Sequence, residues 1–237
     1  MKRFIFIVLI TNLCFLTGCE VTFEPNVRVQ VIGNLVSDNG EPISEAKIGV
    51  YTRRRIGGFI TALGPTGSDE FLLGRNYSVQ DGSFEVNSLY DRDSDFSIII
   101  SNDNNHANYI YSTSTVNYDP EDLTFDLQTV TLPRLAIINY NFMRTSGEGN
   151  TFEFGFNFKD NTCYEYFIAG VLDASLSRCY EDRFLNRTLN DNSPDVDWSF
   201  TALYDTEVEF TYSINGQDPI TENFTINQDN YELTLNY

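Results

Sequence analysis

The stretch "VIGNLVSDNGEPISEAKIGVY" (residues 31–51) carries the clearest fold signal in the sequence. Apolar residues occupy every second position in its last part, at Ala46, Ile48 and Val50, and Val31 and Leu35 keep the same spacing near its start. Between them, Gly40 can adopt a positive φ, and Pro42 fixes φ where no ladder donor is needed. A period of two places the apolar side chains on one face of a strand. The stretch therefore predicts two strands with a turn between them.

The same alternation extends in both directions along the chain. Val27 and Val29 lead into the first strand, and the pair Asp81-Gly82 is a second turn signal. The further alternating apolar positions are Phe84, Val86, Phe96, Ile98 and Ile100. Helical spacing of apolar residues is nearly absent from the chain. This half is predicted to be an antiparallel, all-β domain.

Together with "YSVQDGSFEV" (residues 77–86), the opening stretch resembles the carboxypeptidase regulatory-like family, whose fold is a transthyretin-like β-sandwich. The positions that match the family pattern are Gly33, Leu35, Asp38, Gly40, Pro42, Ile43, Ala46, Ile48, Val50, Asp81, Gly82 and Phe84. The resemblance covers residues 27–133. The chain departs from the family pattern in a long, glycine-rich loop expected from Arg53 to Asn76, and again at Ser78 to Gln80. It implies stability, docking or surface display, without a catalytic group.

Residues 134–237 are predicted to form a second β-sandwich after a joint at Pro133 and Arg134, and no family is recognised for this half. In "TFEFGFNF" (151–158), four phenylalanines share one face that must be covered. Further strands are expected at 164–173, 198–204, 207–214, 220–226 and 231–237. This number of strands indicates an immunoglobulin-like or related sandwich. The fold class is thus all-β, with two antiparallel β-sandwiches in tandem.

The amino-terminal segment has the layout of an export signal. Two basic residues precede an apolar core from Phe4 to Leu16, which is too short to span a bilayer. The end of this core, Leu16-Thr17-Gly18-Cys19, resembles the lipobox of bacterial lipoproteins. The resemblance implies that residues 1–18 are a signal peptide, and that Cys19 carries diacylglycerol and an N-acyl chain such as palmitate. Residues 19–26 would be a tether to a membrane, the outer membrane of a Gram-negative envelope, facing either the periplasm or the cell surface.

Two cysteines remain, Cys163 and Cys179, because Cys14 leaves with the signal peptide and Cys19 carries lipid. An exported chain meets an oxidising compartment, so we expect a disulfide between them. It would close a loop of about 17 residues and stabilise the fold by roughly 3 kcal/mol in the chain-entropy description.

The formal net charge is −19, and it falls to near −21 when Lys2 and Arg3 are removed. Such a surface repels phosphate backbones, so a nucleic-acid partner is not expected. The run Arg53-Arg54-Arg55 is the local exception, and it is interpreted as part of a solvated loop.

Few residues suggest catalysis or a metal ion. The single histidine, His106, lies in "SNDNNHANY", which is interpreted as a polar surface loop; with no second histidine, neither an enzyme nor a zinc site is predicted. Calcium is a weaker hypothesis, based on oxygen ligands at alternate positions in Asp91, Asp93 and Asp95, and again between Asp191 and Asp197. Each of these two runs is more simply a solvated turn.

Two functions remain. The first is a non-catalytic envelope lipoprotein that docks onto another envelope protein, such as a transporter, or displays loops at the surface. The alternative is a glycan-binding lipoprotein in which Tyr109, Tyr111, Tyr118 or Trp198 stacks on sugar rings. An exposed apolar patch or free sheet edge would favour docking, whereas two coplanar exposed aromatics in a concave site would favour glycan binding.

Overall fold

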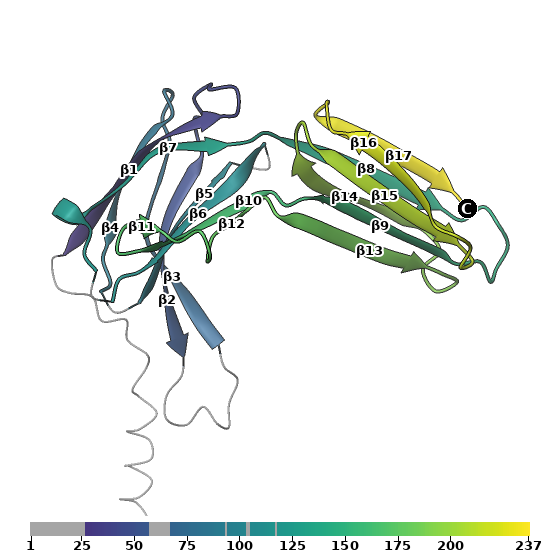
Figure 1. Ribbon diagram of the computed structural model, residues 1–237, viewed down its shortest axis with the longest axis horizontal. Helices are drawn as coiled ribbons and strands as arrows, with labels where there is room; N and C mark the ends of the chain where they lie inside the picture. The colour runs from purple at the N-terminus through teal and green to yellow at the C-terminus, as the bar shows by residue number, and fades with distance from the viewer. Residues whose placement is uncertain (1–26, 57–66, 93, 103–104, 117) are drawn as a thin grey trace, which may run out of the picture.

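The computed structural model describes residues 27–56, 67–92, 94–102, 105–116 and 118–237. These residues form two β-sandwiches that lie end to end (Figure 1), so the all-β prediction is confirmed. The expected signal peptide, tether and Cys19 lie outside the described residues. Within the described ranges, no helix has the length and apolar character needed to cross a membrane.

The first sandwich packs a small sheet against a large one. The small sheet has the order β4 (Ser83–Leu89), β1 (Arg28–Ser37) and β7 (Thr124–Leu132). The large sheet runs through β11 (Val171–Leu172), β10 (Thr162–Ile168), β6 (His106–Ser114), β5 (Asp95–Asn102), β2 (Lys47–Ile56) and β3 (Gly67–Tyr77), and β12 (Arg178–Cys179) also pairs with β10. A short 3-10 helix, η2 (Glu121–Leu123), precedes β7.

The core of this sandwich is formed by the predicted alternating residues. Val31 and Leu35 of β1 face Ile48 and Ile98 of the large sheet, and all four side chains are fully buried. The two turn predictions are confirmed, because Gly40 and Gly82 have φ of +82° and +83°.

The second sandwich also has two sheets. One has the order β14 (Val196–Leu203), β8 (Leu135–Met143) and β17 (Asn230–Asn236). The other has the order β13 (Asp182–Leu189), β9 (Phe152–Lys159), β15 (Glu207–Ile214) and β16 (Ile220–Thr225). All four phenylalanines of β9 are buried against a core that includes Tyr140, Phe142 and Phe210. The apolar face expected from "TFEFGFNF" is therefore covered by the facing sheet.

One segment differs from the expected division at residues 133 and 134. The hairpin of β10, β11 and β12 belongs to the large sheet of the first sandwich, where β10 runs parallel to β6. Two further pairs, β1 with β7 and β8 with β17, are also parallel, although the remaining pairs are antiparallel as expected. Alternation reports which face of a strand is buried, but not which strand lies beside it.

The interpretation of Arg53 to Asn76 as one loop was wrong for its described parts. β2 continues to Ile56 and β3 begins at Gly67, and the two strands pair along their whole length. Arg53 lies opposite Glu70, and their side chains form an ion pair at 3.7 Å. Glycine-rich composition indicated a loop here, but cross-strand pairing extends the hairpin.

The chain crosses between the sandwiches three times, after β7, after β9 and after β12. His106 begins β6 at this junction, so its assignment to a polar surface loop was also wrong. The neighbouring Ala107 N–H donates to the Pro133 carbonyl, and the Arg134 guanidinium lies 3.9 Å from the centre of the Tyr204 ring.

Candidate functional site

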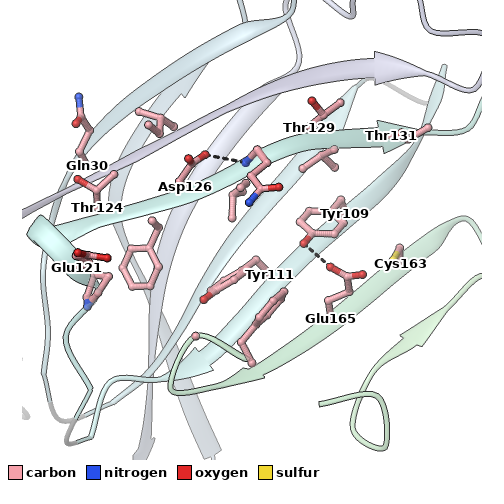
Figure 2. Close-up of a pocket in the computed structure, with 18 of the residues that line it drawn as sticks. Gln30, Tyr109, Tyr111, Glu121, Thr124, Asp126, Thr129, Thr131, Cys163 and Glu165 are labelled. Carbon is pink, nitrogen blue, oxygen red and sulfur yellow. Dashed lines mark hydrogen bonds between the residues drawn. The ribbon is translucent and has the colours of Figure 1, made fainter. Parts of the chain in front are cut away.

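A groove opens between β7, an edge strand of the small sheet, and β10, which lies with its hairpin at one end of the large sheet (Figure 2). On the opposite side of the sandwich, β3 and β4 contact each other. Between β7 and β10, by contrast, the sheets remain apart and leave a cavity of about 950 Å³. The groove is therefore a consequence of the topology, because the small sheet ends at β7 while the large sheet extends to β10 and its hairpin.

Aromatic side chains form the floor of the groove. Tyr109 and Tyr111 project from β6 and are only 8% and 6% exposed. Phe167 of β10 stacks on Tyr111 with ring centres 4.3 Å apart, and Phe125 of β7 meets Tyr111 edge-on at 5.8 Å. Alternation along β6 turns Tyr109 and Tyr111 to the same side of the sheet, where side chains of the neighbouring β10 flank them and β7 of the facing sheet packs against them.

Carboxylates accompany these rings. The Tyr109 hydroxyl donates to Glu165 Oε2 at 2.6 Å, and Figure 2 shows this bond in the middle of the groove. Exposed acidic residues at the rim are Glu121 and Asp122 of η2 and Asp126 of β7. Among the described residues that line the groove, none is Lys, Arg or His. The groove is thus aromatic at its floor and negatively charged.

The hydroxyls of Tyr109, Tyr111 and Tyr180 stay protonated at physiological pH. Burial raises the pKa of Tyr109, with Glu165 adding to the shift, and burial also raises the pKa of Tyr111. Burial, followed by the Glu165 charge, raises the pKa of Tyr180 to about 12. These phenols are therefore neutral groups that can donate or accept hydrogen bonds.

The predicted disulfide between Cys163 and Cys179 is confirmed, and it lies against the groove. The two residues are directly opposite each other on β10 and β12. Together with Glu165 they are the single group of three metal-type ligands within the described part of the chain, with ligand atoms inside 4.8 Å of one another. The sulfurs are bonded to each other and so are not thiolates, which are the form of cysteine that binds metals.

The hairpin tip beside the groove carries exposed apolar residues that sequence reasoning missed. β10 and β11 are joined by Ala169 and Gly170, which both have positive φ, at +48° and +78°. The exposed fractions at and near the tip are 55% for Ile168, 70% for Val171, 46% for Leu172 and 48% for Leu176. The segment "YEYFIAGVLD" resembles an ordinary buried strand, so only the structure reveals that its second half is solvent-facing.

The aromatic residues expected to stack on sugars lie in two separate places, one on each sandwich. Tyr109, Tyr111 and Tyr118 line the groove, but the first two rings are buried and Tyr111 is already stacked on Phe167. Trp198 lies on β14 of the second sandwich and is 62% exposed. Tyr109 and Tyr111 therefore do not present a pair of coplanar exposed faces.

Carboxylates in both runs considered for calcium make contacts within the fold. Asp91 is buried and accepts hydrogen bonds from Ser94 Oγ at 2.7 Å and Thr52 Oγ1 at 3.2 Å, whereas Asp93 lies outside the described residues and Asp95 is on β5. In the second run, Asp191 pairs with Arg144, and Asp195 accepts the Arg144 backbone N–H at 2.9 Å. Calcium binding stays a prediction.

No model of a protein family matches the chain, and no curated protein matches its sequence. Solved structures give weak likenesses. A 9R-lipoxygenase from Cyanothece PCC8801 is 22% identical over 53% of this chain and 20% of its own, with a TM-score of 0.28. The Bacillus anthracis TIE protein is 10% identical over 90% of this chain and 34% of its own, with a TM-score of 0.30.

The shaft pilin SpaA from Lactobacillus rhamnosus GG is 9% identical over 88% of this chain and 97% of its own, with a TM-score of 0.30. The chain spans less than two thirds of the length of the first structures it matches, namely the lipoxygenase, a 3-chlorocatechol 1,2-dioxygenase from Rhodococcus opacus 1CP and the TIE protein. At these TM-scores the likenesses carry no argument about function.

Proposed function

We propose that this chain is a non-catalytic, lipid-anchored envelope protein whose first sandwich docks onto another envelope protein. The observation that carries the proposal is the exposed apolar tip at Ile168, Val171 and Leu172, in a hairpin that pairs with β6 beside the groove and is closed by the disulfide. Contiguous exposed apolar residues on a fixed element are typical of a surface that another protein covers.

The location follows from the amino-terminal sequence, whose lipobox-like residues lie outside the described part of the chain. Several acyl chains on Cys19 would give stable attachment, because each buried methylene contributes about 0.8 kcal/mol. We place the protein at the outer membrane. Mass spectrometry of the purified protein tests this: acylated Cys19 as the first residue is expected, and a chain that keeps residues 1–18 would contradict it.

The absence of catalysis is supported by the chemistry of the groove. Its cysteines are paired with each other, and its single hydrogen-bonded Tyr–Glu pair lacks a histidine. His106 is at the junction between the sandwiches and does not line the groove. The resemblance of residues 27–133 to carboxypeptidase regulatory-like domains also favours docking over a reaction.

The decisive experiment is purification of the tagged, lipidated protein from its own envelope after cross-linking. Val171→Asp should abolish recovery of a specific envelope protein, because it places a charge in the centre of the apolar tip. Ile220→Asp is the matched control, since Ile220 is 50% exposed on β16 of the other sandwich. Equal recovery with both variants, or no specific protein with the unmodified chain, would refute docking through this hairpin.

Glycan binding remains the second candidate, favoured only by the exposure of Trp198. This is the single tryptophan of the chain, so its fluorescence reports directly on its surroundings. Stacking on a sugar would remove the ring from water and shift its emission to shorter wavelength. Unchanged emission during titration with envelope polysaccharide would eliminate Trp198 as a sugar platform.

A further inference from the structure

We propose that the groove between β7 and β10 binds a lysine or arginine side chain of the docked protein, with Glu165 as its counter-ion and the tyrosine rings as its walls. This inference rests on the proposed docking function and names the chemistry of the partner segment.

The charge of the groove selects a cation. Glu165 lies at the floor, the acids of η2 and Asp126 lie at the rim, and no basic residue occurs in the described lining. Glu165 Oε2 accepts the Tyr109 hydroxyl, while Oε1 accepts no hydrogen bond from the described residues. One carboxylate oxygen is thus left to pair with an incoming ammonium or guanidinium group.

A second, independent observation comes from Tyr111. Its side chain is 94% buried, since it is 6% exposed, yet its hydroxyl has no hydrogen-bond partner among the described residues. Figure 2 shows this hydroxyl directed along the groove, toward the end where Glu121 lies. The oxygen itself is open to the groove, since it is not among the buried side-chain atoms that lack a partner, and it can accept a hydrogen bond from a bound N–H group.

The aromatic walls favour an organic cation over a metal ion. Ring faces attract ammonium and guanidinium groups, and they do so more strongly when the site is shielded from water. Tyr118 and Tyr180 are half-buried in the wall, and Tyr109 and Tyr111 form the floor. A metal ion would need converging oxygen, nitrogen or thiolate ligands, whereas the sulfurs beside Glu165 are joined in a disulfide.

Two other occupants fit less well. Addition of a strand along β7 is hindered by a bulge, because Gln128 has φ of +54° and the pairing of β1 with β7 shifts between Ile32 and Asn34. A second copy of this chain would bring another strongly acidic surface, with a net charge of −19, to an acidic groove. A basic side chain needs no strand pairing along β7 and brings no like charge to the groove. Apolar residues beside it in the partner segment would contact the hairpin tip.

The test uses the full mature chain in detergent and three capped peptides, Gly-Leu-Lys-Leu-Lys-Leu-Gly and its versions with glutamate or glutamine in place of lysine. Calorimetric titration should detect the lysine peptide and neither of the others. Glu165→Gln should weaken binding about tenfold, because glutamine still accepts the Tyr109 hydroxyl but loses the charge. Tyr111→Phe keeps the ring and should weaken binding about threefold through loss of the hydroxyl.

Glu222→Gln on β16 is the control, since it removes an equal charge from an exposed strand of the other sandwich. Equal losses from Glu165→Gln and Glu222→Gln, or equal binding of the three peptides, would overturn the inference. If a partner is captured through Val171 but is indifferent to Glu165→Gln, docking stands and the cation site fails. If the lysine peptide binds at Glu165 but no envelope protein is recovered, the cation site stands and the proposed docking fails.

Discussion

His106 lies at the junction of the two sandwiches, where it begins β6. Its Nδ1 atom is buried and has no hydrogen-bond partner among the described residues. Burial lowers its pKa; Asp38 opposes this shift and Arg134 adds to it. The unfolded chain, with an ordinary histidine pKa of about 6.5, therefore binds a proton before the folded protein does.

This difference predicts a pH dependence of stability. Because the unfolded state binds more protons below about pH 6.5, the free energy of unfolding should fall as the pH falls from about 7 to about 5. His106→Gln should lose less over the same window, since glutamine does not titrate. Thermal unfolding of both proteins across these pH values measures the difference, and parallel curves would contradict the prediction. Both proteins carry the same acidic residues, so the contribution of those residues to the pH dependence cancels in the difference between the two curves.

The positive φ of single turn residues could be predicted from the sequence, but the burial of His106 at the junction could not. Gly40 and Gly82 follow Asn and Asp, and this local sequence suffices to predict positive φ. His106 follows two asparagines, so its neighbours indicate a loop. Its true environment depends on Pro133 and Arg134, which lie far away in the sequence and pair with the start of β6.

Among the elements, the hairpin of β10, β11 and β12 is closed by a covalent bond. β10 pairs with β6, and the Cys163–Cys179 disulfide joins β10 to β12 across a separation of 16 positions. Replacing both cysteines by alanine should lower the free energy of unfolding by about 3 kcal/mol. Urea denaturation measures this loss.

The same denaturation experiment contains its own control. The unmodified protein under reducing conditions should approach the stability of the double alanine variant, because both lack the cross-link. A double variant as stable as the oxidised protein would show that the hairpin is held by strand pairing alone. A reduced protein much less stable than the variant would instead indicate that free thiols are unfavourable in this position.

The positions of most strands could be predicted from the sequence, but which strands pair with each other could not. The buried faces of β1, β2, β5 and β9 all follow from alternation. The parallel pairing of β10 with β6 does not, because a period of two specifies the buried face and leaves the partner strand open. The stacking of Phe167 on Tyr111 accompanies this pairing, because β10 brings its ring against a tyrosine of β6.

For the whole molecule, the groove could not be predicted, because its parts come from five separated segments. They lie within 30–32 of β1, 109–111 of β6, 118–131 around η2 and β7, 163–170 of β10 and its turn, and 179–180 at the end of the hairpin. Sequence reasoning selected Tyr109, Tyr111 and the two cysteines separately, for stacking and for a disulfide. Only the return of the chain to the first sandwich places them beside Glu165 in one site.

The threefold crossing of the junction predicts that residues 27–133 do not form a stable unit alone. Without β10, the β6 edge and the rings of Tyr109 and Tyr111 would be exposed, so the fragment should bind apolar dyes and unfold without a cooperative transition. Joining residues 162–180 to this fragment through a flexible glycine-serine linker should restore a cooperative transition in urea, because the linker replaces only the excursion of β8 and β9 through the second sandwich. If the fragment alone unfolds at the same urea concentration as the joined protein, β10 does not complete the first sandwich energetically, and the hairpin is an appendage on a domain that already folds by itself.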